Sequence, residues 1–218
     1  GLKGVTIYRD GCREGILSLE DKPVEKVDEN FFIRDEVLDA NVVHFNNDGT
    51  PWIAFVGTKA GKPFEIFSGP ADLETFPIPK SVKNVQIIKV KTEGQSRYDF
   101  RYIESYGYQN TLGGLSRVFD KEYYNYSRLI SGMLRSQVDM TSIINIIDGM
   151  YFESESLHSW KNGVIRSLKI FVQDGTVTKE ICPECGGIMI YTGGCKQCGD
   201  CGWIICGRCA ACKQGGCK

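Results

Sequence analysis

The sequence predicts an α+β fold, in which helices cover an antiparallel sheet, followed by a small cysteine-rich module. Segments typical of strands fill the first half of the chain, and apolar residues at helical spacing fill much of residues 115–172. Strands that precede helices, instead of alternating with them, favour an antiparallel sheet with helices on one face. Nine of the ten cysteines lie in the last 37 residues, and the composition changes sharply at about residue 176.

The predicted sheet starts at residue 41. Residues 42–45 and 52–56 are mostly apolar, and the Asn-Asp-Gly sequence at 47–49 between them predicts a hairpin turn. Prolines are excluded from central strands, and three of them within residues 69–82 predict a loop there. Further strands are expected over residues 63–67, 85–90 and 97–102.

The strand at residues 63–67 has an alternating pattern. Phe64 and Ile66 are apolar, whereas Glu65 between them is polar. Because successive side chains of a strand point to opposite faces, this pattern is typical of a strand with one buried face.

Three helices are expected after the strands. Apolar residues recur at helical spacing from Leu115 to Leu134. Asp139 is a suitable N-cap for a second helix, which carries four isoleucines between residues 143 and 147. A third helix is predicted from about Leu157 to Val172, before the turn residues at 174–175.

The N-terminal 40 residues are expected to form a separate region. Residues 5–9 predict a short strand that ends at the turn pair Asp10-Gly11, and residues 16–40 predict a connecting segment. The sequence starts with Gly1 and not with Met, so we expect a processed chain, a fragment or the second half of a split protein.

The composition is typical of a soluble globular protein, and we expect a cytoplasmic one. The chain is 42% hydrophobic and 24% charged, and its net charge of -1 does not favour binding to nucleic acid or an anionic membrane. It lacks both the apolar run of about 20 residues that spans a bilayer and the apolar core of a signal peptide. Four lysines are expected to form a solvated face, and the two histidines to be surface or satisfied side chains: Lys80, Lys83, Lys89, Lys91, His44 and His158.

Two Cys-x-x-Cys-Gly motifs predict a zinc ribbon. Cys182 and Cys185 form the first motif, and Cys198 and Cys201 form the second; twelve residues separate Cys185 from Cys198. Such pairs bring four thiolates around one Zn²⁺. Cys195 lies three residues before the second motif and could replace one ligand. Residues 188–191 and 203–205 are expected to be the strands of the ribbon.

The remaining cysteines suggest redox chemistry at the end of the chain. Cys206 and Cys209 extend the series and allow a second metal or a mobile thiol cluster. Cys212 and Cys217 form a Cys-x4-Cys pair beside Lys213, and the two glycines before Cys217 leave the backbone free to bring the sulfurs together. A mobile dithiol is suited to thiol–disulfide exchange. A further ligand pair or an inert tail is the alternative.

Five segments give the chain a resemblance to adenosylcobalamin-dependent (class II) ribonucleotide reductases. Residues 2–13 (Leu-Lys-Gly-Val-Thr-Ile-Tyr-Arg-Asp-Gly-Cys-Arg) resemble the end of the catalytic barrel of this family. Residues 61–67 and 127–136 resemble its TSCPD-type domain, residues 182–202 its zinc ribbon, and residues 212–218 its redox tail.

The resemblance implies a function for each segment. It divides the chain into the end of the barrel and a linker (1–40), a TSCPD-type α+β domain (41–175), a zinc ribbon (176–205) and a flexible redox tail (206–218). It implies that Cys212 and Cys217 re-reduce the active-site disulfide, and that thioredoxin or glutaredoxin then reduces the tail. Adenosylcobalamin and the radical and nucleotide sites would belong to the barrel, in the same polypeptide or in a separate large chain. This chain alone is therefore not expected to reduce a ribonucleoside diphosphate.

Alternative assignments stay open. Cys201 and Cys206 have the same spacing as the expected shuttle pair. If they were the shuttle, the zinc ligands would be Cys182, Cys185, Cys195 and Cys198. A nucleic-acid-binding zinc ribbon and a purely structural interaction module are the alternative functions. We expect no membrane partner and favour the reductase over nucleic-acid binding.

Overall fold

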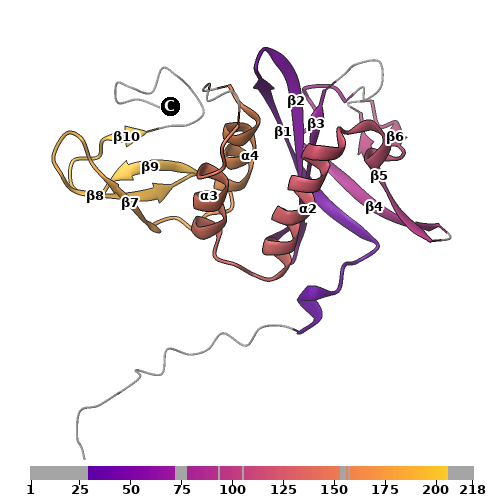
Figure 1. Ribbon diagram of the computed structural model, residues 1–218, viewed down its shortest axis with the longest axis horizontal. Coiled ribbons are helices and arrows are strands. Elements are labelled where there is room, and N and C mark those ends of the chain that lie inside the picture. Colours follow the sequence, from indigo (N-terminus) through magenta and orange to yellow (C-terminus); the bar gives the residue numbers. More distant parts are fainter. Residues whose placement is uncertain are drawn as a thin grey trace, which may run out of the picture.

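The structure is a computed structural model that describes residues 29–71, 78–92, 94–104, 106–152, 156 and 158–205. These residues form a six-stranded antiparallel sheet, a group of helices and a four-stranded antiparallel sheet, in that order along the chain (Figure 1). The predicted α+β class is confirmed. No helix in these ranges combines the length and the apolar character needed to cross a bilayer.

The large sheet has the strand order β3-β2-β1-β4-β5-β6. The predicted hairpin joins β1 to β2, where Asp48 and Gly49 both have positive φ angles (47° and 85°), as the tight turns of hairpins require. The strands are β1 (Val37–Asn47), β2 (Thr50–Lys59), β3 (Lys62–Pro70), β4 (Asn84–Thr92), β5 (Gln95–Ile103) and β6 (Gln109–Leu112).

The large sheet curls, so that its two halves face each other. β1 pairs with β2 over residues 39–47 but with β4 only over residues 37–41. As a result, Phe55 of β2 packs on Phe100 of β5 with ring centroids 4.1 Å apart, although the two strands are not neighbours in the sheet. Phe67 of β3 lies 6.2 Å from the same ring. The concave face of the sheet therefore has an apolar core of its own.

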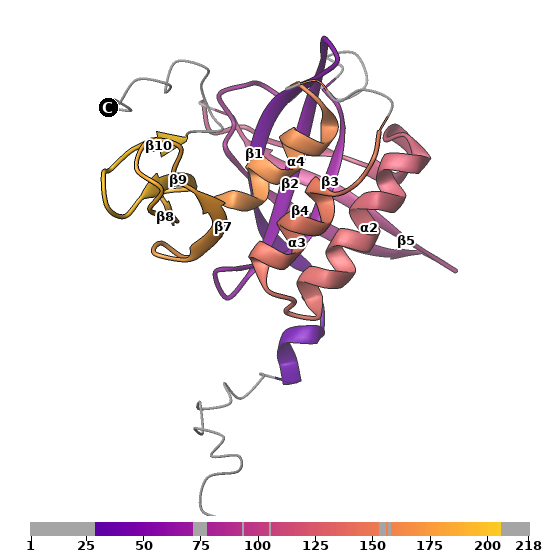
Figure 2. The same cartoon turned by 60° about the vertical axis from the view of Figure 1, so that its left-hand side comes forward.

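Helices cover the opposite face of β1–β3 (Figure 2). Trp52 of β2 lies 4.8 Å from Tyr123 between ring centroids, and Tyr123 lies 5.4 Å from Trp160, so aromatic rings join the sheet to two helices. The helical elements are a 3-10 turn η1 (Glu29–Phe32) and the helices α1 (Leu115–Val118), α2 (Lys121–Arg135), α3 (Met140–Asp148) and α4 (Trp160–Lys169).

Capping side chains set the helix boundaries. Asp139 accepts a hydrogen bond from the Ser142 N–H, which confirms the predicted cap of α3. The first predicted helix is divided, because Asp120 caps a new helix after α1 ends. The third starts at Trp160 and not near residue 157, because the Ser159 side chain accepts from the backbone of its first turn.

The N-terminal boundary of the sheet differs from the prediction. β1 begins at Val37, so residues 37–40 belong to the sheet and not to a connecting segment. Leu38 and Ala40 are buried while Asp39 between them is exposed, an alternation that the charged residues upstream obscured. The strand predicted at residues 5–9 lies outside the described residues, as do residues 72–77 of the loop predicted over 69–82. That loop starts later than predicted, because β3 continues to Pro70, which an edge strand tolerates.

The small sheet has the order β10-β9-β8-β7. Its strands at 188–192 and 204–205 correspond to the two predicted ones, whereas β7 and β9 are additional. Tyr191 of β8 is buried in the helical core, which joins the small sheet to the rest of the fold. The strands are β7 (Val177–Ile181), β8 (Ile188–Thr192), β9 (Cys195–Cys198) and β10 (Ile204–Ile205).

A buried carboxylate holds the N-terminal end of the described chain against the sheet. Glu65 of β3 is fully buried, and both its oxygens accept hydrogen bonds from Arg34, at 2.6 Å from Nη2 and 2.9 Å from Nε. Arg135, the last residue of α2, donates to the same carboxylate at 2.9 Å. We call residues 31–36 the strap, because this triad ties them to β3 and α2.

Replacing Glu65 by Gln should destabilise the fold strongly. The variant keeps the shape of the side chain but leaves two guanidinium groups without a counter-ion, and breaking a buried pair in this way costs about 3–5 kcal/mol. Urea unfolding measures the change. Glu36→Gln, at an exposed position of the strap, is the control and should stay within about 0.5 kcal/mol of the wild type. If Glu65→Gln lowered the free energy of unfolding no more than Glu36→Gln does, the triad would contribute no stability.

His44 should make stability depend on pH. Burial, and next the nearby Lys83 cation, lower the pKa of His44 below its ordinary value. The unfolded chain, whose histidine pKa is about 6.5, therefore binds more protons than the folded chain as the pH falls. The free energy of unfolding should decrease as the pH falls below about 6.5. Urea unfolding at several pH values between 7.5 and 5 should give a smaller decrease for His44→Gln than for the wild type.

Candidate metal centre

Four thiols converge at one end of the small sheet. The Sγ atoms of Cys182, Cys185, Cys198 and Cys201 all lie within 4.8 Å of one another. The Cys182–Cys201 and Cys185–Cys198 sulfur pairs are 3.6 and 3.5 Å apart. Four thiolates bound tetrahedrally to Zn²⁺ at about 2.3 Å would be about 3.8 Å apart. The cluster can therefore hold a metal ion of this size with little movement.

The two Cys-x-x-Cys-Gly motifs fold into the same local structure. The Gly186 N–H donates to the Cys182 carbonyl at 2.9 Å, and the Gly202 N–H donates to the Cys198 carbonyl at 3.1 Å. Both glycines have positive φ angles, 73° and 74°, which residues with a Cβ atom adopt rarely. The glycine after each cysteine pair thus allows the tight turn that points both thiols to one centre.

The charges within the cluster favour a bound cation. The backbone N–H of Cys201, 3.5 Å from the Cys198 sulfur, is the largest cause that lowers the pKa of Cys198, to about 7, and the Asp200 N–H adds to it. For Cys185 the Gly187 N–H lowers the pKa, but hydrogen bonds with the neighbouring thiols outweigh it and raise the pKa to about 12. All four thiols can ionise together near neutral pH only if a cation compensates their charge.

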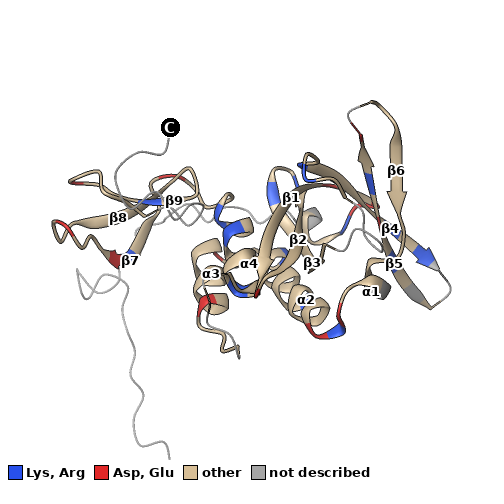
Figure 3. Cartoon of the chain, turned by 90° about the horizontal axis from the view of Figure 1, so that it is seen from above, with Lys and Arg blue, Asp and Glu red and all other residues tan. Residues whose placement is uncertain are grey.

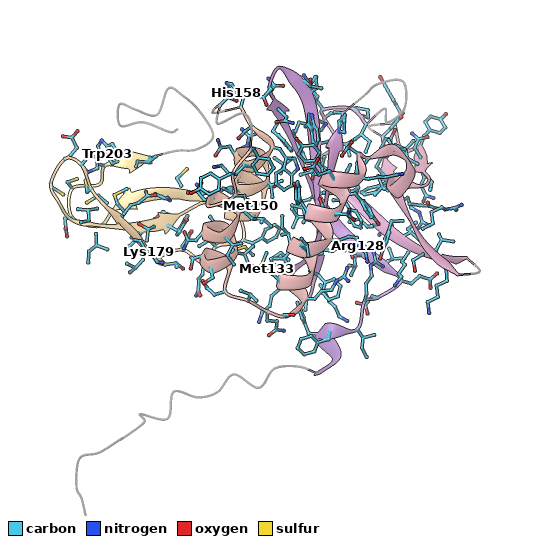
Figure 4. All side chains as sticks on the ribbon, in the orientation of Figure 1. Arg128, Met133, Met150, His158, Lys179 and Trp203 are labelled. Carbon is cyan, nitrogen blue, oxygen red and sulfur yellow. The ribbon has the colours of Figure 1, made fainter. Side chains whose placement is uncertain are left out.

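One side of the cluster is buried and the other faces solvent. Cys182 and Cys198 are buried against Met189, which has no exposed surface, and Trp203 packs at the edge of this group. Cys185 and Cys201 are exposed. In Figure 4, Trp203 marks this end of the small sheet, beside the sulfur atoms. A metal ion can therefore enter from solvent while the buried pair holds its position.

The structure brings together the four cysteines that the two motifs predict as ligands. Cys195 begins β9, where it pairs with Thr192, and it does not belong to the four-thiol cluster. Met189 was not foreseen as part of the centre. The alternation of residues 188–191 would have placed it on the same strand face as buried Tyr191.

The predicted redox residues lie outside the described residues. These are the expected shuttle pair, Cys212 and Cys217, together with Cys206 and Cys209. Their roles, and the alternative pairing of Cys201 with Cys206, stay predictions.

One protein family matches the chain. The model of the NrdJ homologue C-terminal domain matches residues 38–173, from the start of β1 to just beyond α4. No curated protein and no solved structure matches the chain significantly. The match covers more than half of the sequence, and it ends before the first cysteine of the metal centre. The chain therefore belongs to the NrdJ homologue C-terminal domain family, which is related to the C-terminal region of class II ribonucleotide reductases.

Proposed function

We propose that this chain is the C-terminal part, or the small subunit, of an adenosylcobalamin-dependent ribonucleotide reductase, and that it returns the oxidised enzyme to its dithiol state. The observation that carries the proposal is the order of parts along the chain. A domain of the NrdJ-related family leads directly into a four-thiol cluster, and four further cysteines follow that cluster in the last 13 residues.

The four-thiol cluster would be a structural zinc site. Zn²⁺ prefers four-coordinate thiolate sites of this kind, and a site with four protein ligands leaves no position for a substrate. The zinc would fix the ends of β8 and β9 and the turn that leads into β10. The tail would then leave the fold from a defined place, because β10 ends at Ile205, just before Cys206.

The tail would carry two electrons by thiol–disulfide exchange. A thiolate of Cys212 or Cys217 attacks the active-site disulfide and forms a mixed disulfide, which releases one active-site thiolate. The second tail cysteine, as its thiolate, then attacks the tail sulfur of that mixed disulfide and releases the other active-site thiolate. The released thiolates take up protons, the active site regains its dithiol, and the tail is left as a disulfide. Thioredoxin or glutaredoxin would reduce that disulfide by the same chemistry.

The remaining components belong to the catalytic barrel. It would bind the ribonucleotide and adenosylcobalamin, the cofactor that supplies radical chemistry when it is bound. The barrel can belong to the same polypeptide or to a partner chain. In either case the strap lies within residues 1–40, which the resemblance assigns to the barrel end and its linker, and directly before the domain described above.

Zinc content tests the structural site. The purified chain should hold about one zinc ion, and Cys198→Ser should lose it, because a hydroxyl group is a far weaker ligand than a thiolate. Cys195→Ser is the matched control, since Cys195 lies outside the cluster, and it should keep its zinc. Metal analysis by mass spectrometry measures both. Loss of zinc from Cys195→Ser together with its retention by Cys198→Ser would contradict the assignment.

Turnover tests the redox tail. In the assembled reductase, Cys212→Ser with Cys217→Ser should stop product formation after roughly one cycle with thioredoxin, because the active-site disulfide is no longer reduced. A small dithiol reaches the active site directly and should restore turnover. Product per active site is the measurement. Unchanged turnover with thioredoxin would refute the shuttle role, and a loss caused by Cys206→Ser alone would assign it to Cys201 and Cys206.

A further inference from the structure

The large sheet carries a cleft that is separate from the cysteine chemistry. Its volume is about 690 Å³, and it lies where β1, β4, β5 and β6 come together with the segment that precedes β4. The cysteine module lies at the other end of the molecule, beyond the helices (Figure 1). The cleft volume is within the range of roughly 300–1,000 Å³ that is typical of small-molecule sites.

Within the described structure, Arg101 of β5 lines the cleft with an unsatisfied donor. Its Nε atom is buried and has no hydrogen-bond partner among the described residues. The nearest carboxylate along the same face of the strand, Asp99, is already engaged. It accepts two hydrogen bonds of 2.9 Å from Arg97 and a third from the Gly114 N–H. The guanidinium group of Arg101 thus brings a positive charge into the cleft, and its buried Nε–H donor has no acceptor among the described residues.

The other charged groups of the cleft add to this preference for an anion. Lys83 also lines it, and its ammonium group uses one donor on the Lys80 carbonyl at 2.9 Å, which leaves two donors. Asp39 is the single acidic residue among the lining residues, against two basic ones. The cleft is locally positive although the chain as a whole has a net charge of -1. Figure 3 shows basic residues, in blue, on β4 and β5, two of the strands that line the cleft.

The remaining polar groups are suited to hydroxyl groups of a ligand. The amides of Asn84, Gln86 and Gln109 line the cleft and can both donate and accept hydrogen bonds. Gln86 donates to the Asp39 carboxylate at 3.2 Å, which orients that carboxylate and leaves lone pairs for a ligand hydroxyl. The cleft thus offers cationic donors for a phosphate group and, beside them, amides and a carboxylate for hydroxyl groups. A phosphorylated molecule with several hydroxyl groups would fit this arrangement.

We propose that this cleft binds a small phosphate ester. Arg101 and Lys83 contact the phosphate, because a guanidinium group matches the geometry of phosphate oxygens. Asp39 and the three amides contact hydroxyl groups of the ester. A nucleotide and a sugar phosphate share this chemistry, and the test separates them. The site goes beyond the proposed reductase role and does not depend on any cysteine.

Calorimetric titration of the full chain with AMP, ribose 5-phosphate and inorganic phosphate tests the proposal. Saturable binding of at least one ester, tighter than binding of inorganic phosphate, is expected. Tighter binding of AMP than of ribose 5-phosphate identifies a nucleotide site, and equal binding of the two esters a sugar-phosphate site. Arg101→Gln should weaken ester binding at least about tenfold, the effect of losing a charged hydrogen bond. Arg128→Gln on α2 removes the same charge away from the cleft and should bind like the wild type.

A second variant keeps the test decisive if Arg101→Gln fails to fold. Asp39→Asn should weaken binding of the esters but not of inorganic phosphate, since Asp39 is assigned to hydroxyl groups. Thermal melting checks that each variant is folded. Three outcomes would overturn the proposal: no saturable binding of either ester, equal affinity for inorganic phosphate and the esters, or equal weakening by Arg101→Gln and Arg128→Gln.

Discussion

The Glu65 carboxylate is buried at the edge strand of the large sheet, where removing a charge from water costs several kcal/mol. Ion pairs with two arginines offset this cost. Arg34 comes from the strap, and Arg135 comes from the end of α2. Each guanidinium group also lies over an aromatic ring: Arg34 is 5.3 Å from the Tyr98 centroid and Arg135 is 5.1 Å from that of Phe64. The strap, the sheet and α2 must therefore reach their final positions together.

The same edge of the sheet shows how the fold prevents unwanted strand pairing. β3 is an edge strand, and unpaired N–H and C=O groups there could pair with another chain. Ser131 of α2 accepts a hydrogen bond from the Ile66 N–H at 2.9 Å, and Trp160 of α4 donates to the Ser68 hydroxyl at 2.9 Å. Helix α2 thus covers this edge, on the side where the strap docks, while Trp160 fixes a side chain of the same strand.

Local sequence patterns correctly predicted the turns, caps and motifs that depend only on residues close together in the sequence. The Asp48-Gly49 turn, the Asp139 cap and the convergence of the two cysteine motifs each need only a few adjacent positions. The burial of Glu65 could not be predicted in this way. Its alternation with Phe64 and Ile66 indicated one polar face, yet all three side chains are buried. The reason lies in Arg34 and Arg135, which are 31 and 70 residues away in sequence. Likewise, Arg101 became a candidate ligand-binding residue only once four strands had formed the cleft around it.

If the proposed function is correct, the number of cysteines follows from two separate tasks, metal binding and thiol–disulfide exchange. Four thiolates around one zinc ion are fixed in position and share their charge with the metal, which makes them poor partners for exchange. Exchange requires an accessible thiolate that can reach a disulfide on another part of the enzyme. Tyr191 of β8 is buried in the helical core and attaches the small sheet to the rest of the fold. The small sheet is therefore not expected to move to an active site. A shuttle attached to this ribbon therefore needs cysteines beyond the cluster, and the sequence provides four of them after Cys201.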